Sequence, residues 1–263
     1  MSDASDRVAG ILLGLAAGDR NGGPVRMSVR LAESLIERRA VDVEDIAARY
    51  LAWWHDGAFD TGPTAAEVFM LVSSGLSFPA AARQAHIAFG EQTAGCNPAH
   101  RSAPLAMLPD LSGEQLASFA RQEAALTHQH PLSGDVAAAV VSLCRALVQG
   151  YVWKDAIAAS RVGRLPETEA ALAPQTKGSP NQGGFAPDVL AAAVYFVGGS
   201  DSFDAALDAS LSFAGPANYC PVLVGSIGGA RWGAGNIGQR VLSHCDLTPR
   251  VRSAAERLAS RWK

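Results

Sequence analysis

The stretch "GILLGLAAG", residues 10–18, places a glycine at every fourth position, at Gly10, Gly14 and Gly18. The stretch "GSIGGARWG", residues 225–233, repeats this spacing near the other end of the chain. Residues four apart share one face of a helix, and a glycine inside a helix costs roughly 1 kcal/mol relative to alanine. Three glycines on one face indicate that another backbone comes very close. We therefore predict two central helices in tight mutual contact, with their polar ends brought together.

Apolar residues recur at helical spacing along most of the remaining chain. Several segments begin with proline and end with glycine, which is typical of helices. No run combines β-branched residues, period-two alternation and hairpin turns. We therefore predict an all-α fold of about a dozen helices in a single domain that spans residues 1–263. The predicted helices beyond the first glycine series cover residues 29–39, 42–54, 63–75, 79–90, 113–122, 133–149, 153–160, 187–196, 202–213, 221–232 and 248–262.

Residues 165–184 interrupt this pattern, because they are rich in proline, glycine, glutamine, asparagine and serine. We predict a long loop there, and long loops in compact domains are often functional.

Composition narrows the classes of partner. The chain is 48% hydrophobic and 18% charged, which provides a sizeable core, and its formal net charge is −3. Proteins that bind nucleic acid usually carry a basic excess, so we expect no nucleic-acid partner, although a small phosphorylated ligand remains an open possibility.

The apolar run 8–17 is about half of a bilayer span, the four cysteines form no CxxC pair, and we recognise no secretory signal. We expect a soluble, cytoplasmic protein without a membrane partner and leave its oligomeric state open.

Two polar loops hold candidate carboxylates. Asp19 follows the first glycine series in "AAGDRNGGP", residues 16–24, and Asp60 lies beside Thr61 in "HDGAFDTGPT", residues 55–64. An acid before a helix often caps its first turn, and capping can coexist with ligand contact at a helix N-terminus. Asp19 is therefore a polar cap or a site residue. Asp60 caps the next helix, faces a ligand, or does both.

A third polar loop is "AGCNPAHRSAPLAM", residues 94–107, which contains Gly95, Cys96, His100 and Arg101. Arginine pairs bidentately with carboxylate or phosphate groups, and an unperturbed histidine titrates near neutrality. Arg101 is therefore a candidate ligand for a substrate phosphate, or one half of an internal salt bridge. Gly95, Cys96 and His100 are candidate substrate contacts.

Two further polar loops precede predicted helices. "LTHQHP", residues 126–131, contains His128, for which capping and packing is the alternative to a role in a site. "AGPANYCPVLVG", residues 214–225, contains Asn218 and Tyr219 just before the second glycine series. Helix N-termini offer free N–H groups to anions. Five polar loops in an otherwise apolar helical chain predict one shared pocket.

The order of these motifs resembles the ADP-ribosylglycohydrolase family, which includes the dinitrogenase reductase-activating glycohydrolases, from Val8 to Gly238. "GILLGLAAGDRNGGP" resembles the opening helix of the family with its Gly-Asp end, and "FDTGPT" stands where the family carries an acidic Thr-Asp-Asp-Thr loop. "AGCNPAHRSAPLAM" resembles the Gly-Asn-Gly-x-x-Met-Arg-x-x-Pro-Leu loop, and "LTHQHP" supplies the following Thr-His. "GGFAPDVLAAAVYF" is similar to the Gly-Tyr-x-x-Asp-Thr-Leu segment, and "GPANYCPVLVGSIGGARWGAGNIG" to the closing Gly-Asp-x-Asp-Thr motif with its small-residue helix.

This resemblance implies a compact all-α domain with a cleft for ADP-ribose or a related nucleotide. It also implies hydrolysis of an N- or O-glycosidic bond at the anomeric carbon of ribose. In the family, two magnesium ions are held in the cleft by the two acidic motifs.

The sequence departs from this pattern where the family binds metal. Pro216 and Asn218 occupy the places of the two late aspartates, and Tyr219 replaces the following threonine. The early loop keeps one acid, Asp60, and Arg26 stands where some members carry a catalytic glutamate. Mg²⁺ prefers hard, mostly anionic oxygen ligands. We therefore assign no metal ligand and no cofactor, and leave Mg²⁺ open in case the site around Asp60 is partly retained.

Our leading hypothesis is a glycoside hydrolase that cleaves an N-glycosidic bond of an ADP-ribosylated or ribosyl-nucleotide substrate. Asp60 would activate water or stabilise the oxocarbenium-like transition state. Asp19 would add a second acid, and His128 or His100 would protonate the leaving group. The predicted substrate contacts are Thr61, Gly95, Cys96, His100, Arg101, Asn218 and Tyr219.

The alternative is a non-catalytic protein that keeps the fold and binds ADP-ribose or another nucleotide, because both late carboxylates are lost. A third possibility is an enzyme whose cleft is adapted to another glycoside. In each case we expect the partner to be a small nucleotide or an ADP-ribosyl conjugate.

Overall fold

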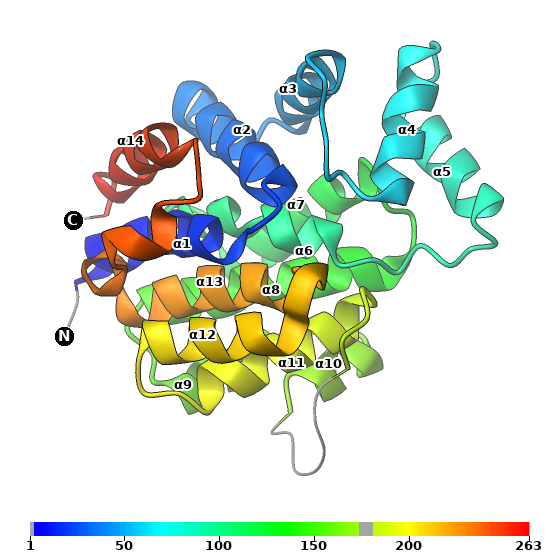
Figure 1. Cartoon of the computed structure of the whole chain (residues 1–263). Helices are drawn as coiled ribbons and strands as arrows, with labels where there is room; N and C mark the ends of the chain where they lie inside the picture. Colours follow the sequence, from blue (N-terminus) through cyan, green and yellow to red (C-terminus); the bar gives the residue numbers. More distant parts are fainter. Residues whose placement is uncertain (1–2, 174–180, 263) are drawn as a thin grey trace.

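Helices form nearly all the regular structure of residues 3–173 and 181–262, the part of the chain that the computed structural model describes (Figure 1). The predicted all-α class is confirmed. Outside the helices, backbone pairing in this part is limited to an isolated antiparallel bridge between Gly95 and Phe185. The α-helices are α1 (Ala4–Gly18), α2 (Gly23–Arg38), α3 (Val43–His55), α4 (Pro63–Ser73), α5 (Phe78–Ala88), α6 (Asn97–Arg101), α7 (Gly113–Ala125), α8 (Pro131–Val148), α9 (Trp153–Ser160), α10 (Pro166–Ala171), α11 (Ala186–Gly198), α12 (Phe203–Ala214), α13 (Tyr219–Trp232) and α14 (Thr248–Ala259). Four short 3₁₀ helices cover Ala103–Met107, Gly215–Ala217, Ala234–Asn236 and Gln239–Leu242.

Helices α1 and α13 pack against each other through their glycines, as predicted. A Cβ atom added to Gly14 would lie 2.0 Å from the carbonyl oxygen of Gly225, and one added to Gly10 would lie 2.2 Å from that of Gly229. The third contact differs from the prediction, because Gly18 faces the carbonyl oxygen of Pro221 at 2.0 Å. The two backbones therefore touch without intervening side chains, and the C-terminal end of α1 meets the N-terminal end of α13.

The last glycine of the second series has another role. Gly233 ends α13 with φ 87°, a conformation that favours glycine. Its backbone N–H donates to the carbonyl oxygen of Gly229 and so satisfies one of the last carbonyls of the helix.

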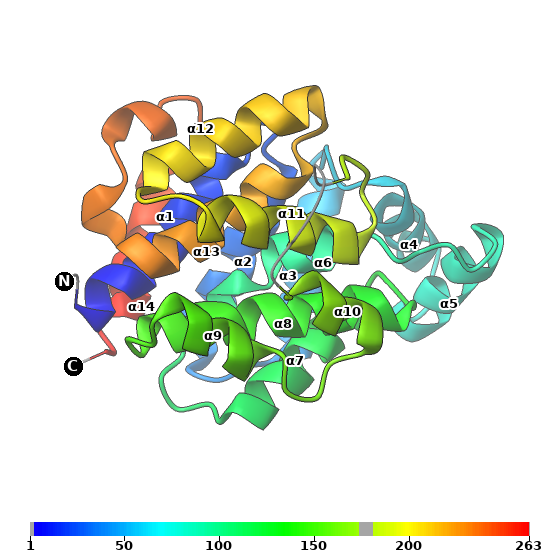
Figure 2. The ribbon, with the colours of Figure 1, turned by 90° about the horizontal axis from the view of Figure 1, so that it is seen from below.

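The other helices surround this central pair. Helices α14 and α2 cover one side, and α11 and α12 pack against α13 on the other (Figure 1). Viewed from below, α9 and α10 lie beside α8 (Figure 2). By length and composition α8 could cross a membrane, but 89% of its apolar window is buried inside the protein. It therefore has the burial expected of a core helix.

Helices α4 and α5 form an antiparallel hairpin that projects from the body (Figure 1). They bury a small separate cluster of Val68, Ala81, Ala82 and Ala85. The loop that leads into α4 starts from the body and carries Asp60, so the base of the hairpin forms one wall of the site described below.

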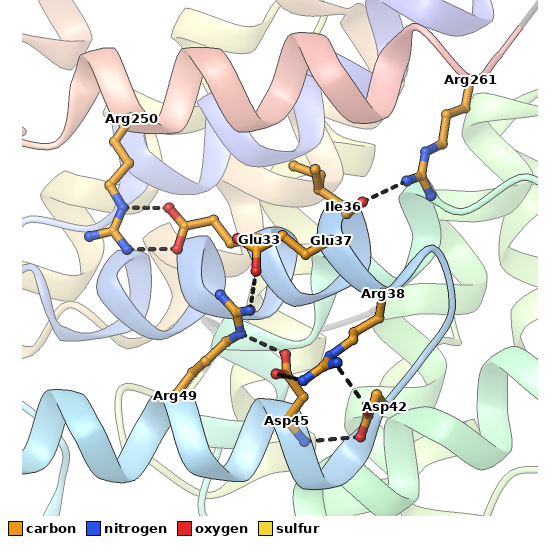
Figure 3. Close-up of polar contacts among 9 residues, drawn as sticks. All are labelled: Glu33, Ile36, Glu37, Arg38, Asp42, Asp45, Arg49, Arg250 and Arg261. Atoms are coloured by element: carbon orange, nitrogen blue, oxygen red, sulfur yellow. Dashed lines mark hydrogen bonds and ion pairs between the residues drawn. The ribbon is translucent and has the colours of Figure 1, made fainter.

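Ion pairs fasten α2 to its two neighbours (Figure 3). Arg250 of α14 pairs bidentately with Glu33 at 2.6 Å for both bonds, and Arg49 of α3 pairs with Glu37 at 2.6 Å. Arg38 of α2 pairs with Asp45 of α3 at 2.7 Å. Arg261 donates to the carbonyl oxygen of Ile36 at 3.2 Å. Exposed pairs each contribute roughly 0.2–1 kcal/mol, so this network supports the position of α2 more than it determines the fold.

Two short helices lie in segments where we predicted loops. Helix α10 (Pro166–Ala171) occupies the start of the predicted loop 165–184, and α6 (Asn97–Arg101) lies within the polar loop 94–107. Both have proline in the first turn, where its missing N–H costs nothing. Residues 174–180 of the predicted loop lie outside the described residues.

Candidate functional site

Four elements that are distant in sequence enclose a polar cleft of about 300 Å³. They are the turn between α1 and α2, the loop before α4, the short helix α6, and the turn between α12 and α13. The structure thus brings together Asp60, His100, Asn218 and Tyr219, four of the predicted site residues. The rest of the lining consists of Asn21, Pro24, Gly62, Asn97, Pro216 and Ala217.

Asp60 adopts a left-handed backbone conformation with φ 52°. Its Oδ2 accepts a hydrogen bond from the backbone N–H of Gly23 at 3.1 Å, at the first residue of α2. A side chain at Gly23 would collide with this loop, because an added Cβ would lie 2.2 Å from the carbonyl oxygen of Asp60. Asp60 therefore caps α2. Capping of α4 was one of the interpretations that the sequence left open, but the residue at the cap position of that helix is Gly62, which offers no side chain.

The pKa of Asp60 is raised above its ordinary value. Partial burial raises it most, and the negative charge of Asp19 raises it further. Hydrogen bonds from the Gly23 backbone and the Asn21 side chain act in the opposite direction, since they stabilise the ionised form. Asp60 is nevertheless exposed at the mouth of the cleft and can reach a ligand there.

Asp19 is buried, with 2% of its surface exposed, and its carboxylate is fully engaged. Oδ1 accepts from the backbone N–H of Asn21 at 3.2 Å and of Gly22 at 2.8 Å, and Oδ2 accepts from that of Val25 at 2.8 Å. Oδ1 also accepts from the amide of Asn218 at 3.0 Å. Asp19 thus fixes the start of α2 behind the cleft, and of its two anticipated roles the structure shows the polar cap.

Asn218 precedes α13 in a left-handed conformation with φ 58°, which asparagine tolerates better than most residues. Its Nδ2 donates to Asp19, and its Oδ1 accepts from the backbone N–H of Arg20 at 3.0 Å. Both ends of the amide are therefore used to hold the α1–α2 turn against α13. Asn218 still forms part of the cleft wall.

His100 is 4% exposed, yet its Nε2 atom has no hydrogen-bond partner among the described residues. Burial lowers its pKa to about 4; the Tyr219 backbone raises the pKa, while neighbouring Arg101 lowers it further. The ring is thus neutral near pH 7. Each nitrogen of a neutral imidazole either donates or accepts a hydrogen bond, and a ligand hydroxyl can satisfy either case. The Nε2 atom is itself shielded from solvent, and none of the described residues satisfies it.

The structure places Arg101 away from the cleft, contrary to our expectation of a substrate ligand. The side chain is 1% exposed, and its Nε donates to Oε1 of Glu123 at 2.5 Å. Its Nη2 donates to Thr127 at 2.8 Å, and its guanidinium lies over the ring of Tyr50. Tyr50 in turn donates to the same oxygen of Glu123 at 3.0 Å. Arg101 therefore forms an internal salt bridge, the other interpretation that the sequence allowed.

His128 also lies outside the cleft. It is buried, its Nδ1 is 2.9 Å from the hydroxyl of Thr127, and it borders a different hollow beside α7 and α8. Burial, with a smaller effect from Arg101, lowers its pKa to about 3. It is too far inside the protein, and too weak a base, to serve as the catalytic acid that we considered. Gly95 lies next to His128, since a Cβ atom added to Gly95 would be 3.2 Å from Nε2 of His128.

Cys96 and Thr61 support the walls instead of lining the cleft. The backbone N–H of Cys96 donates to the carbonyl oxygen of Gly184 at 3.1 Å, and burial raises the pKa of its thiol to about 12. The carbonyl oxygen of Thr61 accepts a hydrogen bond from Nδ2 of Asn97 at 2.7 Å. The amide of Asn97 thus joins the loop before α4 to α6.

Sequence reasoning missed Asn97, Asn21 and Gly23. The signal available for Asn97 was its place inside the polar motif of residues 94–107. Gly23 gave a weaker signal, as one of several glycines in the turn before α2. The close approach that requires it is visible only once the loop carrying Asp60 is in place.

A larger hollow of about 470 Å³ lies elsewhere, between α7, α8 and α9. Its wall combines alanine, leucine and valine with glycine, with polar residues such as Gln149, and with arginines whose guanidinium groups bind the protein. Arg145, for example, donates to the carbonyl oxygens of Ala106 and Leu111 at 3.0 Å each. We assign the functional site to the smaller cleft because carboxylate, imidazole and amide groups converge there.

The donors of this cleft do not fit the pair of magnesium ions that the resemblance implies. Magnesium prefers anionic oxygen ligands in octahedral geometry. The oxygens of Asp19 already accept four hydrogen bonds, the amide of Asn218 is engaged at both ends, and Pro216 has no donor atom. Asp60 alone is left as an anionic ligand in the lining. Across residues 3–173 and 181–262, no three His, Cys, Asp or Glu side chains are grouped to hold a metal.

A comparison with solved structures shows which known fold this chain resembles. A solved structure titled "ADP-ribosylglycohydrolase-related protein complex" superimposes with a TM-score of 0.80, covers 100% of both chains and is 24% identical to this chain. No curated protein sequence matches. The pattern of the ADP-ribosylglycohydrolase family matches residues 25–263, and the chain belongs to this family of glycohydrolases. The resemblance stated from the sequence is therefore confirmed.

Proposed function

We propose that this protein hydrolyses the N-glycosidic bond of a ribosylated or ADP-ribosylated substrate, with Asp60 as the carboxylate that acts on the anomeric carbon. The observation that supports this proposal is the position of Asp60. Among the described residues that line the cleft it is the one carboxylate, and the His100 imidazole and the amide of Asn97 line the same cleft. Residues held at positive φ often occur at functional sites, and Asp60 and Asn218 are both in this conformation.

Cleavage of a glycosidic bond at ribose passes through an oxocarbenium-like transition state. The backbone N–H of Gly23 fixes Oδ2 of Asp60, so the carboxylate is oriented before the substrate arrives. It can then stabilise the cation or accept a proton from the attacking water, a contribution of about 10²–10⁴-fold. His100 and Tyr219 line the same cleft, where they would contact the sugar.

The size of the cleft agrees with a small reacting group. About 300 Å³ is at the lower end of the range for ligand sites. This volume accommodates a ribosyl unit with its leaving group, and the remainder of a nucleotide would extend from the mouth. Because the donors do not fit two magnesium ions, we propose that the reaction needs neither ion and is insensitive to a chelator.

The test is turnover by Asp60→Asn across a panel of nucleosides, nucleotides and ADP-ribosyl conjugates, with release of ribose-containing product as the measurement. Asparagine tolerates the same positive φ and keeps an oxygen for the Gly23 N–H, so the variant removes the charge and little else. We expect kcat/KM to fall by about 100-fold or more. Asp208→Asn, on the exposed face of α12, is the matched control and should be unchanged. Full turnover by Asp60→Asn contradicts the proposal.

A second candidate is a protein that binds ADP-ribose or another nucleotide without cleaving it. It is favoured by the contact between Asp19 and Asn218, which closes the place where the family resemblance implies a metal ligand. Calorimetry with ADP-ribose, with and without magnesium, distinguishes the two candidates. Binding without product release from any member of the panel supports this second function.

A further inference from the structure

The cleft is unusual in its charge. Its described lining contains one carboxylate, Asp60, and no lysine or arginine. A phosphate group placed there would meet a negative charge and find no positive side chain. A positively charged group would be attracted instead, since opposite charges at contact distance in a partly buried site attract more strongly than in bulk water.

The nearby arginines do not reverse this charge. Arg101 is paired with Glu123 in the interior, and Arg26 is paired with Asp246 at 2.7 Å. Arg20 lies against the ring of His244 at 2.9 Å. Arg20 and Arg26 border a separate hollow of about 190 Å³ on the other side of the α1–α2 turn. Asp60 is therefore the one charged side chain among the described residues that line the cleft.

The cleft also lacks a strong proton donor for a leaving group. His100 is buried and uncharged near neutral pH. Asp60 cannot both remain ionised to stabilise the oxocarbenium ion and carry the proton that a leaving group would need. A neutral leaving group departs as an anion unless it is protonated. A leaving group that is already positively charged departs as a neutral molecule and needs no acid.

The lining of the cleft also contains an aromatic residue, Tyr219. Tyr219 is 36% exposed, and its ring rests on Gly184, where an added Cβ would lie 3.2 Å from two ring carbons. Gly184 therefore leaves room for this ring orientation. The face of an aromatic ring attracts cations, by about 0.5–1 kcal/mol at exposed sites. The carboxylate of Asp60 and the ring of Tyr219 both line the cleft, and each of these groups attracts cations.

We propose that the cleft selects ribosides whose anomeric carbon is bonded to a positively charged ring nitrogen, of the pyridinium type. This inference rests on the proposed function and names its substrate class. In the reaction, the bond between the anomeric carbon and the ring nitrogen breaks, and its electron pair stays on nitrogen to give a neutral heterocycle. The oxygen of water bonds to the anomeric carbon, and its proton passes by way of Asp60 to solvent.

The test compares two probes of nearly the same shape, nicotinamide riboside and its reduced, uncharged dihydro form. We expect calorimetry to show the charged riboside binding about fivefold more tightly or better, the factor that corresponds to 1 kcal/mol for a charge pair. Asp60→Asn should abolish the difference, and Asp208→Asn should keep it. Tyr219→Leu should weaken binding of the cation by about two- to fivefold, while Tyr219→Phe should retain it.

Turnover of the charged riboside is then compared with that of inosine, whose leaving group is neutral. We expect hydrolysis of the charged riboside by wild type and by Asp208→Asn, with inosine slower by at least about 100-fold. Equal binding of the two probes, or hydrolysis of inosine as fast as that of the charged riboside, overturns the inference. In that case Asp60-dependent hydrolysis of inosine still supports the proposed function. Selective binding of the cation without hydrolysis of any riboside overturns the proposed function and keeps the selectivity.

Discussion

The side-chain amide of Asn218 donates a hydrogen bond to the carboxylate of Asp19 across 3.0 Å, although the two residues are 199 positions apart. This contact ties the turn after α1 to the start of α13. It stands at a place where the family resemblance implies an aspartate. An uncharged amide here donates a hydrogen bond to the Asp19 carboxylate, so this carboxylate has a partner without a bound cation.

An aspartate at this position should therefore be harmful. Asn218→Asp would place two carboxylates within hydrogen-bond distance in a buried site, and like charges there disfavour ionisation of both. We expect the free energy of unfolding to fall by about 1–3 kcal/mol in the absence of divalent cations, measured by urea denaturation. Gln129→Glu, at an exposed position before α8, is the control and should change it little. Unchanged stability of Asn218→Asp would show that the contact with Asp19 is dispensable.

The contact between α1 and α13 leads to a larger effect. Gly14→Ala would place a methyl group 2.0 Å from the carbonyl oxygen of Gly225, and neither backbone can move away without opening the core. We expect a loss of more than about 3 kcal/mol or failure to fold. Gly113→Ala, where an added Cβ meets nothing within 4 Å, should leave the thermal midpoint unchanged or slightly higher. Similar midpoints for the two variants would disprove the close approach.

The ion pair of Arg101 and Glu123 should be essential for stability. Glu123→Gln leaves a buried guanidinium without its counter-charge, and breaking one side of a buried pair typically costs about 3–5 kcal/mol. The exposed pair of Arg161 and Glu169 offers a comparison, since Glu169→Gln should cost less than about 1 kcal/mol. Chemical denaturation of both variants checks the prediction. A small effect of Glu123→Gln would mean that Arg101 reaches solvent or another partner.

Two buried histidines predict loss of stability in mild acid. The pKa values of His100 and His128 fall to about 4 and about 3 in the folded protein, below the ordinary value near 6.5. Between these values the unfolded chain binds more protons, so stability is complete above pH 6.5 and is lost as pH falls towards 4. Each group contributes up to about 1.4 kcal/mol per pH unit in this window. His100→Met should reduce the slope of unfolding free energy against pH, and an unchanged slope would contradict the burial of this ring.

Asp60 should show the opposite relation to stability. Folding raises the pKa of Asp60, so this carboxyl group holds its proton more tightly in the folded state. The stability that Asp60 contributes is therefore present below its ordinary pKa and is lost as pH rises through the raised pKa. Asp60→Asn should therefore have a thermal midpoint at pH 7 no lower than that of wild type, while its turnover falls. A clear drop in the midpoint would indicate that the charge of Asp60 mainly stabilises α2.

Much of this fold was readable from local pattern. The spacing of Gly10, Gly14 and Gly18 predicted the close approach, because few other causes retain glycine inside a helix. Proline and glycine at segment ends predicted most helices. The sequence did not predict the short helices α6 and α10, because one or two turns are too short to show the helical period of apolar residues. Their prolines also resemble those of turns.

The site was only partly readable, because its chemistry depends on partners distant in sequence. The convergence of Asp60 and Asn218 followed from the polar loops. The pairing of Arg101 with Glu123 did not, since Glu123 lies in a helix whose sequence, "ARQEAAL", looks like an exposed face. The capping of α2 by Asp60 was also hidden. A cap is normally sought in the residue just before the helix, and this one comes from 37 residues away.

The seam between α1 and α13 also bears on how the chain reaches its native state. Helix α1 ends at Gly18 and α13 begins at Tyr219, so their contact can form only late in synthesis. Contacts of such long range slow folding and keep apolar surface exposed in the meantime. A nascent chain that stops before α13 leaves the apolar face of α1 uncovered on the ribosome. We therefore expect chaperones that bind exposed apolar surface to bind the incomplete chain during its synthesis.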